Sequence, residues 1–407
     1  MRDPSFLAEP AQLYRAAQLL LQTTSTDGLA ALPDTLPEHG IGSDATLEQL
    51  APHIIARAQR LGESTALAHM DPPTPWITWA VTQWNAALNQ NLLHPATAPA
   101  AIDIERRVID WLSPAMGMTG GHVTPGASIA NLTALWAARD GAGIQRVLAS
   151  DAAHLSIAKS ARILGLDFQT VETDREGRLL ADALPTQMHD ACLVLTAGTT
   201  ATGMIDPLAA GQSAGWRHVD AAWAGALRFS PRYADLLDGI TQADSVALSA
   251  HKWLFQPKES AMVFFRDTAA ANAAISFDGA YLAQPNIGVL GSHGATAAPL
   301  LATLLAWGRD GLAKRIDRCM QNAKALQDWL SAQSQVQCLG EAQTGVVVWR
   351  LEDDARTRAL SGMLPVGSTS LTQLNGGTWL RNVCANPMAD VPALCQAIGK
   401  ALDRLPQ

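Results

Sequence analysis

The sequence predicts an α/β fold in which a mostly parallel sheet is covered by helices on both faces. Between residues 76 and 265, short β-forming runs alternate with stretches of helical periodicity. The runs are RVLAS (146–150), ACLVLTA (191–197), GWRHVD (215–220), SVALSA (245–250) and AMVFF (261–265). Strands that are separated by helices pair in parallel through crossover connections, which bring helices onto both faces of the sheet.

Three regions follow one another along the chain. Residues 8–22 have apolar side chains at helical spacing, and the next twenty or so residues are rich in Pro, Gly and Thr. We therefore expect an N-terminal helical arm and linker over 1–75 and a large domain over 76–297. From residue 298 a long helical pattern leads into TGVVVWRL and TWLRNV, which predict the strands of a smaller α+β domain over 298–407.

Composition limits the possible functions. The 407 residues are 48% hydrophobic and 16% charged, which predicts a globular protein with a large core. The formal net charge of −8 argues against nucleic-acid binding and against a polybasic membrane surface, because both need a positive field. No uncharged apolar run reaches about 18 residues, so no membrane span is expected. A small-molecule ligand fits better.

Five scattered cysteines without CxxC spacing predict neither a disulfide framework nor a metal site. The start of the chain lacks the charged residues, apolar core and small-residue cleavage site of a signal peptide. We therefore expect a cytoplasmic protein.

Four groups of chemical interest come directly after apolar or β-forming runs, where ligands of open α/β sheets bind. The turn TPGAS (124–128) offers backbone N–H groups that suit a phosphate, and it precedes a helix with Ile129, Leu132, Leu135 and Trp136 on one face. His154, Asp220 and Lys252 follow the other runs. Each has an ordinary alternative: a plain strand-to-helix turn, a structural histidine, a helix-capping aspartate and a lysine that extends to solvent.

Taken together and in this order, the four groups suit pyridoxal phosphate, which needs a phosphate cradle, a ring-stacking partner, a carboxylate for its pyridine nitrogen and an amine for its aldehyde. Here the sequence resembles the pyridoxal-phosphate-dependent group II amino acid decarboxylases, of the aspartate-aminotransferase fold type I. The resemblance runs from about His69 to Arg381 and is carried by HPATAPAAIDIERRVIDWL (94–112), TPGASIANL (124–132), AAHLSIAKSARILG (152–165), TAGTTATGMIDPL (196–208), HVDAAWAG (218–225), SAHKWLFQP (249–257) and GSHGATAAPLLATLLAWGRDGL (291–312). It implies a large domain with a seven-stranded sheet.

The resemblance implies three catalytic roles. Lys252 would form the internal aldimine, Asp220 would keep the pyridine nitrogen protonated, and His154 would stack on the ring and could also take part in proton transfer. The segment 277–296 is too short for the mobile loop whose tyrosine donates a proton in animal aromatic decarboxylases. Tyr281 could be the donor here, and a simple packing role is the alternative.

The resemblance also implies binding residues. For the cofactor they are Gly126, Ala127, Ser128, His154, Thr199, Thr200, Asp220, Ala222, Ser249, His251 and Lys252. Arg381 matches an arginine that engages the substrate α-carboxylate, with a salt bridge inside the domain as its alternative. His69 is the second expected substrate-binding residue.

Substrate choice is left open by the sequence. AHMDPPTP (68–75) and HKWLFQP (251–257) resemble bacterial diaminobutyrate decarboxylases most, which favours L-2,4-diaminobutyrate or another small polar amino acid. Aspartate, glutamate and cysteine sulfinate stay open. A carbon–carbon lyase or aminotransferase on the same scaffold and a non-catalytic binding protein are the alternative functions. The family architecture also implies a homodimer with active sites at the subunit interface.

Overall fold

The structure is a computed structural model that describes residues 6–26, 29 and 31–405. The chain divides into two compact units, Met1–Arg60 and Leu61–Gln407. The domain boundaries expected at 75/76 and 297/298 stay predictions. Within the described residues, no helix is both long enough and apolar enough to cross a membrane.

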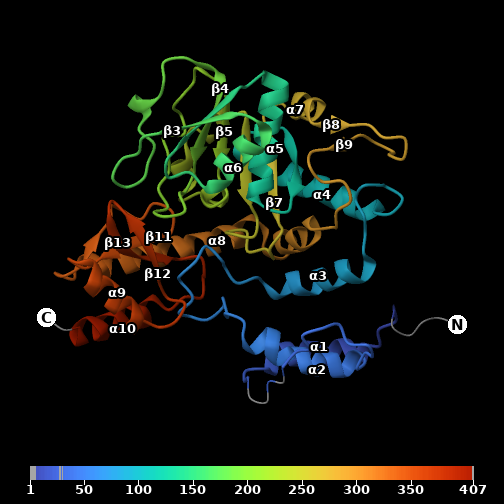
Figure 1. The fold of residues 1–407 in the computed structure, drawn as a ribbon, viewed down its shortest axis with the longest axis horizontal. Coiled ribbons are helices and arrows are strands. Elements are labelled where there is room, and N and C mark those ends of the chain that lie inside the picture. The colour runs from blue at the N-terminus through green and yellow to red at the C-terminus, as the bar shows by residue number, and fades with distance from the viewer. Residues whose placement is uncertain (1–5, 27–28, 30, 406–407) are drawn as a thin grey trace. The chain divides into compact units, whose positions relative to one another are not determined.

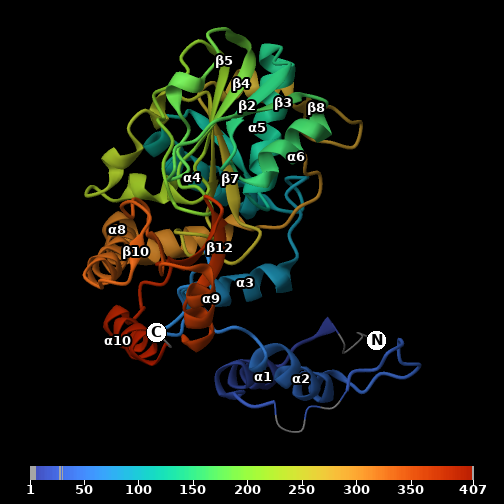
Figure 2. The ribbon, with the colours of Figure 1, turned by 60° about the vertical axis from the view of Figure 1, so that its left-hand side comes forward.

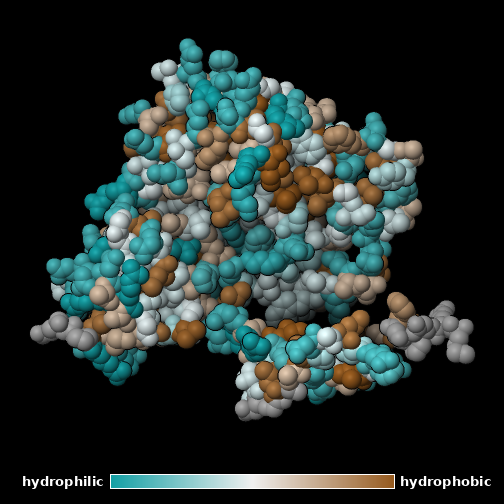
Figure 3. All heavy atoms as spheres, in the orientation of Figure 1, coloured by the Kyte–Doolittle hydropathy of each residue, from teal (hydrophilic) through white to brown (hydrophobic). Residues whose placement is uncertain are grey.

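The N-terminal unit consists of two helices, α1 (Pro10–Gln22) and α2 (Ser43–Ala51), with a π-helical turn at Pro52–Ala56 (Figure 1). An exposed ion pair between Arg15 and Glu48, at 2.6 Å, joins the two helices. Among the described residues of the unit, only Leu19 and Ala51 are buried apolar side chains. Hydrophobic residues therefore remain on its surface, as Figure 3 shows.

A seven-stranded sheet forms the centre of the larger unit, in the order β1-β7-β6-β5-β4-β2-β3 (Figures 1 and 2). Its strands are β1 (Gly120–Thr124), β2 (Arg146–Ser150), β3 (Asp167–Val171), β4 (Met188–Thr196), β5 (Ala214–Asp220), β6 (Ser245–Ser249) and β7 (Ala261–Phe265). Six of these strands run in one direction, and β7 runs opposite to them. The predicted mostly parallel sheet and all five predicted strands are confirmed.

Burial explains why these strands were predictable. Every residue of β6 and β7 is buried, and β4 and β5 are buried at their carboxyl-terminal ends. Strands enclosed on both faces read as continuous apolar runs. The edge strand β3, with sequence DFQTV, is largely exposed and has no such run, so its pattern did not predict it.

Helix α5 (Ala127–Ala142) covers one face of the sheet, where it contacts β5, β6 and β7. Its buried residues are mostly small, including Ala130, Ala134, Ala137 and Ala138. Small side chains let the helix lie close to the sheet. Of the four residues expected on one apolar face, Leu135 is fully buried, whereas Ile129, Leu132 and Trp136 are partly buried.

The remaining helices pack around this core. Helices α6 (Leu155–Leu164) and α7 (Thr268–Ala274) contact α5, whereas α3 (Trp76–Leu88) and α4 (Pro99–Leu112) contact α8 (Ala297–Ser331). The predicted long helix is thus present, but Gly308 interrupts it with a positive φ of 61°. Short 3-10 helices span Ser113–Met116, Ala181–Ala183, Ala224–Phe229, Ala234–Leu237 and Ile240–Gln242.

A second, antiparallel sheet follows α8, in the order β10-β11-β13-β12. Its strands are β10 (Gln337–Cys338), β11 (Val346–Arg350), β12 (Ser370–Leu374) and β13 (Gly377–Val383), and helices α9 (Asp354–Met363) and α10 (Val391–Arg404) accompany them. The predicted strands TGVVVWRL and TWLRNV correspond to β11 and β13. A separate ribbon pairs β8 (Ser276–Phe277) with β9 (Asn286–Ile287).

Candidate active site

Lys252 lies in the turn that follows β6. Its backbone N–H donates to the Ser249 carbonyl at 3.3 Å, and its carbonyl accepts from the Phe255 N–H at 2.9 Å. Burial lowers the pKa of the Lys252 amine, while the Asp220 carboxylate acts in the opposite direction. A lowered pKa leaves more of the amine unprotonated, which makes it a better nucleophile.

Asp220 is the last residue of β5, the strand next to β6, and only 4% of it is exposed. Its carboxylate accepts hydrogen bonds from Asn131 Nδ2 at 2.9 Å and from the Ala222 N–H at 3.1 Å. The turns after β5 and β6 are fixed to each other because the rings of Trp223 and Trp253 pack at 4.4 Å. Asp220 and Lys252 are therefore held at the same edge of the sheet.

His154 forms the N-cap of α6, directly after β2. Its Nδ1 accepts from the Ser156 backbone N–H at 3.2 Å and lies 2.8 Å from Ser156 Oγ. Burial lowers the pKa of His154, with the Asp220 carboxylate opposing this effect. We infer that His154 is neutral near pH 7.

The turn before α5 leaves room for a ligand. Gly126 is the N-cap in an extended conformation, and a Cβ placed on it would meet no atom within 4 Å. Ala127 and Ser128 begin the helix, where backbone N–H groups lack intrahelical acceptors and the helix dipole favours an anion. The first turn of α5 can therefore hold a phosphate.

Several buried polar atoms near the carboxyl ends of the parallel strands have no hydrogen-bond partner among the described residues. Ser150, Thr196 and Ser249 end β2, β4 and β6, and each has an unpaired hydroxyl. Nδ1 of His251 is also unpaired, and burial lowers its pKa to about 4. Because buried polar groups are normally bonded, these atoms are available to hydrogen-bond a ligand.

Arg381 extends the site from the second sheet. It lies on β13, is 8% exposed, and donates through Nη1 to the Ala68 carbonyl at 3.2 Å. Its Nε has no partner among the described residues, and burial lowers its pKa to about 10. The positive charge of Arg381 also contributes to lowering the pKa of Lys252, which indicates that the two side chains lie near each other.

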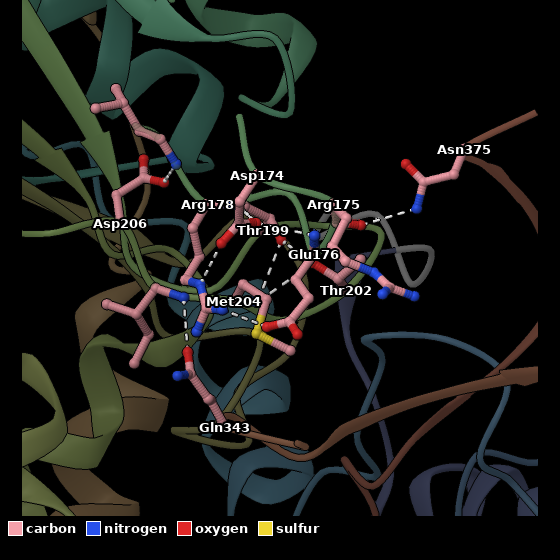
Figure 4. A network of polar contacts seen from close by, with 12 residues as sticks. Asp174, Arg175, Glu176, Arg178, Thr199, Thr202, Met204, Asp206, Gln343 and Asn375 are labelled. Carbon is pink, nitrogen blue, oxygen red and sulfur yellow. Dashed lines mark hydrogen bonds and ion pairs between the residues drawn. The ribbon is translucent and has the colours of Figure 1, made fainter. Parts of the chain in front are cut away.

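Two expected cofactor residues are engaged elsewhere. Thr199 is fully buried, its hydroxyl lies 2.7 Å from that of Thr202, and it accepts from the Met204 N–H at 3.2 Å. Figure 4 shows Thr199 and Thr202 bonded to each other and to Met204, beside the turn that carries Asp174. Thr200 is exposed. Their contact with the cofactor stays a prediction.

Two other expected residues are exposed. Tyr281 lies between β8 and β9 with 76% of its surface accessible, and no contact between it and Lys252 is found among the described residues. His69 is exposed as well, although Ala68 before it binds Arg381. Their roles as proton donor and substrate contact stay predictions.

The structure adds residues that the sequence analysis did not single out. Asn131 hydrogen-bonds Asp220 and Ser156, and Ser156 in turn hydrogen-bonds His154. Asp71 pairs with Lys258, and its carboxylate partly opposes the burial that lowers the pKa of both Lys252 and Arg381. One signal was available for Asn131, since it is a polar residue inside an otherwise apolar helical stretch.

Comparison with known proteins decides the family. The conserved domain of pyridoxal-dependent decarboxylases matches residues 28–352. The chain belongs to this family. An L-2,4-diaminobutyrate decarboxylase of Rhizobium meliloti (strain 1021) is 31% identical over 441 residues, covering 96% of this chain and 89% of that protein. An aspartate 1-decarboxylase of Aliivibrio fischeri (strain ATCC 700601 / ES114) is 27% identical over 378 residues, covering 78% of this chain and 69% of that protein.

Solved structures agree on the fold. The crystal structure of Oryza sativa TDC with PLP and tryptamine superposes with a TM-score of 0.85 at 20% identity, covering 98% of this chain and 99% of that chain. The predicted fold and family are therefore confirmed. The protein is an amino acid decarboxylase that depends on pyridoxal phosphate.

The residues present fit this cofactor. The open space at Gly126 and the helix N-terminus suit its phosphate, and the unpaired atoms of Ser249 and His251 provide polar groups beside Lys252. The buried carboxylate of Asp220 suits a protonated pyridine nitrogen.

Proposed function

We propose that the decarboxylase acts on a small amino acid with a charged side chain, with L-2,4-diaminobutyrate as the first candidate. The relative that is 31% identical over 96% of this chain is a decarboxylase of that amino acid. The observation that carries the proposal is that Arg381, a buried cation with an unpaired Nε, bonds the carbonyl of Ala68, and the carboxylate of Asp71 follows three residues later, paired only with the exposed Lys258 among the described residues. A diamino acid offers one group for each.

In this proposal Lys252 presents its amine to the aldehyde of the cofactor. Asp220 holds a proton on the pyridine nitrogen, and Ala222, which is buried beside it, leaves room for the ring. His154 covers the ring. When bound, pyridoxal phosphate accepts the electron pair left at Cα as CO2 departs.

The phosphate is held by the first turn of α5 and by side chains near Lys252. Gly126, Ala127 and Ser128 provide backbone N–H groups. Ser249 can donate its unpaired hydroxyl, and His251 can donate from whichever ring nitrogen carries the proton. Both side chains lie in or next to the segment that carries Lys252, so phosphate and aldehyde are positioned together.

The substrate is oriented by opposite charges. Arg381 has a free Nε and suits the α-carboxylate, because a guanidinium can bind a carboxylate through two parallel hydrogen bonds. Asp71 suits the distal ammonium group of the substrate. In the described structure Asp71 is paired with Lys258, whose side chain is 62% exposed and free to be displaced.

The test is CO2 and amine release from L-2,4-diaminobutyrate, ornithine, aspartate, glutamate and cysteine sulfinate with the cofactor supplied. We expect the highest kcat/KM with diaminobutyrate. Aspartate is the second candidate, since one relative is an aspartate 1-decarboxylase. A keto acid or an aldehyde product without CO2 would instead indicate aminotransferase or lyase chemistry.

Asp71→Asn sharpens this test. Loss of the carboxylate should lower kcat/KM for diaminobutyrate by roughly 10- to 100-fold, the range of a charged hydrogen bond, and should not lower it for aspartate. The control is Asp328→Asn, which changes an exposed carboxylate on α8. Equal losses for both substrates would contradict recognition of the ammonium group by Asp71.

We further propose that the enzyme is a cytoplasmic homodimer. The exposed apolar side chains of α1, Leu13, Leu20 and Leu21, support burial against a second copy, because two small helices with so few buried residues are marginal alone. All five cysteines are free, as expected in a reducing compartment. Light scattering should give twice the chain mass, and a monomer that remains fully active would contradict the dimer.

A further inference from the structure

Hydrogen bonds connect His154 and Asp220 through a set of mostly buried side chains. We call it the Asn131 network, and its members are Asn131, His154, Ser156, Trp216, His218, Asp220 and Ser245. Asn131, His218 and Ser245 are 0% exposed, and Ser156 is 2% exposed. Because these four side chains are shielded from water, each must find its hydrogen-bond partners within the protein.

The direction of the bonds is fixed first at Asp220. An ionised carboxylate only accepts, so the Asn131 side chain must point its NH2 group toward Asp220 Oδ2, at 2.9 Å. The same Nδ2 donates its second hydrogen to Ser156 Oγ at 3.0 Å. Ser156 Oγ therefore accepts from Asn131 and retains its own hydrogen to donate.

The bonds at the other end follow from this orientation of Asn131. The indole of Trp216 only donates, and it donates to Ser245 Oγ at 2.8 Å. The Asn131 carbonyl oxygen, which the bond to Asp220 turns toward His218, lies 2.9 Å from Nε2 of His218 and accepts from it. Nδ1 of this histidine is then free to accept from Ser245 at 2.8 Å. The donation from Trp216 to Ser245 is compatible with the directions that Asp220 sets.

This order reaches His154. Ser156 Oγ donates its hydrogen to Nδ1 of His154 at 2.8 Å, and the Ser156 backbone N–H, which cannot reverse, donates to the same atom at 3.2 Å. With Nδ1 occupied as an acceptor, the proton of the neutral ring sits on Nε2. No hydrogen bond of Nε2 is found among the described residues.

We propose that Asn131 is a positioning residue that holds the ionised Asp220 and, through Ser156, keeps the proton of His154 on Nε2. His154 can then donate a hydrogen bond into the site, but it has no lone pair there to take up a proton. It orients the ring and the substrate and does not act as the base. The catalytic meaning of this inference rests on the proposed function. The directions of the hydrogen bonds, in contrast, do not depend on the cofactor.

The first test is nitrogen NMR of the cofactor-free protein labelled with 15N in its ten histidines. The His154 signals are assigned by their loss in His154→Gln. At neutral pH we expect a pyridine-type Nδ1 and a pyrrole-type Nε2. A protonated Nδ1, in either a neutral or a cationic ring, overturns the proposal, whatever substrate the enzyme turns over.

The second test is Asn131→Ala, with Thr133→Val as the matched control. Thr133 is a buried polar residue on the same helix, but within the described part of the chain its hydroxyl bonds only the Ile129 carbonyl, at 2.8 Å. Asn131→Ala should move the His154 signals toward a mixture of tautomers and weaken cofactor binding by roughly 10- to 100-fold. Thr133→Val should change neither. Unchanged His154 signals and cofactor affinity in Asn131→Ala would refute the positioning role, and wild-type spectra decide the tautomer even if that variant does not fold.

Discussion

Two groups of polar residues in the active site, a floor and a rim, differ in whether their buried polar atoms have hydrogen-bond partners. The floor, which we define as Asn131, Ser156, His218, Asp220 and Ser245, has no buried unpaired side-chain atom within the described part of the chain. The rim, defined as Ser249, His251 and Arg381, has one such atom in each residue. The floor is completed by folding, whereas the rim lacks partners that a ligand can supply.

This difference has an energetic meaning. A buried polar atom without a partner costs about 1–3 kcal/mol, so a ligand that bonds the rim atoms gains stability from them. A satisfied network in a low-dielectric interior instead fixes one arrangement of its groups. Rigidity at the floor and unsatisfied bonding at the rim together favour binding of one ligand in one orientation.

The largest effect is expected from Lys252→Ala, which leaves floor and rim unchanged and removes only the reacting amine. Decarboxylation should fall by more than about a thousandfold, since no other group takes over the covalent role. The visible absorption band of the bound cofactor should change as well, while circular dichroism stays native. Lys324→Ala, at an exposed ion pair on α8, is the control. Normal turnover by the Lys252 variant would refute its assignment.

The next effect comes from breaking the floor with Asp220→Asn. The amide keeps the size of the side chain but loses the charge that stabilises a protonated pyridine nitrogen. We expect turnover to fall by about 100- to 1,000-fold, which corresponds to a loss of about 3–4 kcal/mol of transition-state stabilisation. Assays of CO2 release measure the turnover, and titration with pyridoxal phosphate measures the cofactor affinity. The exposed Asp235→Asn should behave like wild type, and an equally active Asp220 variant would argue against the floor as the support of the ring.

A smaller and different effect is expected at the rim from Arg381→Ala. Its free Nε is proposed to bind the substrate carboxylate, so KM should rise by about 10- to 100-fold with a smaller change in kcat. Cofactor affinity should be nearly unchanged, which separates this variant from the floor variant. The exposed Arg358→Ala on α9 serves as control. A loss of cofactor binding instead would mean that Arg381 belongs to the floor.

Much of this architecture was predictable because burial leaves a local pattern. The apolar runs of β6 and β7 identified the core strands, and positions directly after strands identified Lys252, Asp220 and His154. The exposed strand β3 left no such pattern. The break at Gly308 was also not predicted, since one glycine within a helical period is compatible with a continuous helix.

The supporting residues could not be found in the same way. Asn131 contacts Ser156, 25 positions away, and Asp220, 89 positions away. Such contacts depend on how α5 lies over the sheet, which no local period encodes. Asp71 lies in a proline-rich stretch that predicts only a loop. Its charge acts on Arg381 because the segment that carries Ala68 packs against β13, where Arg381 bonds the Ala68 carbonyl.

The smallest effect concerns pH and compares His218 of the floor with His251 of the rim. Burial lowers the pKa of each to about 4. Below about pH 6.5 the unfolded chain therefore takes up protons that the folded protein refuses, so the free energy of unfolding falls between pH 6.5 and 4. Each histidine contributes a slope of up to about 1.4 kcal/mol per pH unit. Denaturant unfolding at pH 7, 6 and 5 measures this slope.

Cofactor should separate the two histidines. A bound phosphate next to His251 favours its charged form and raises its pKa, so its share of the slope should shrink on saturation with pyridoxal phosphate. His218 is enclosed by Asn131 and Ser245 and should keep its share. His251→Asn should remove the cofactor-dependent part of the slope, whereas exposed His39→Asn should not. If the slope does not respond to the cofactor, His251 does not bind the phosphate, and the phosphate contacts of the rim reduce to Ser249.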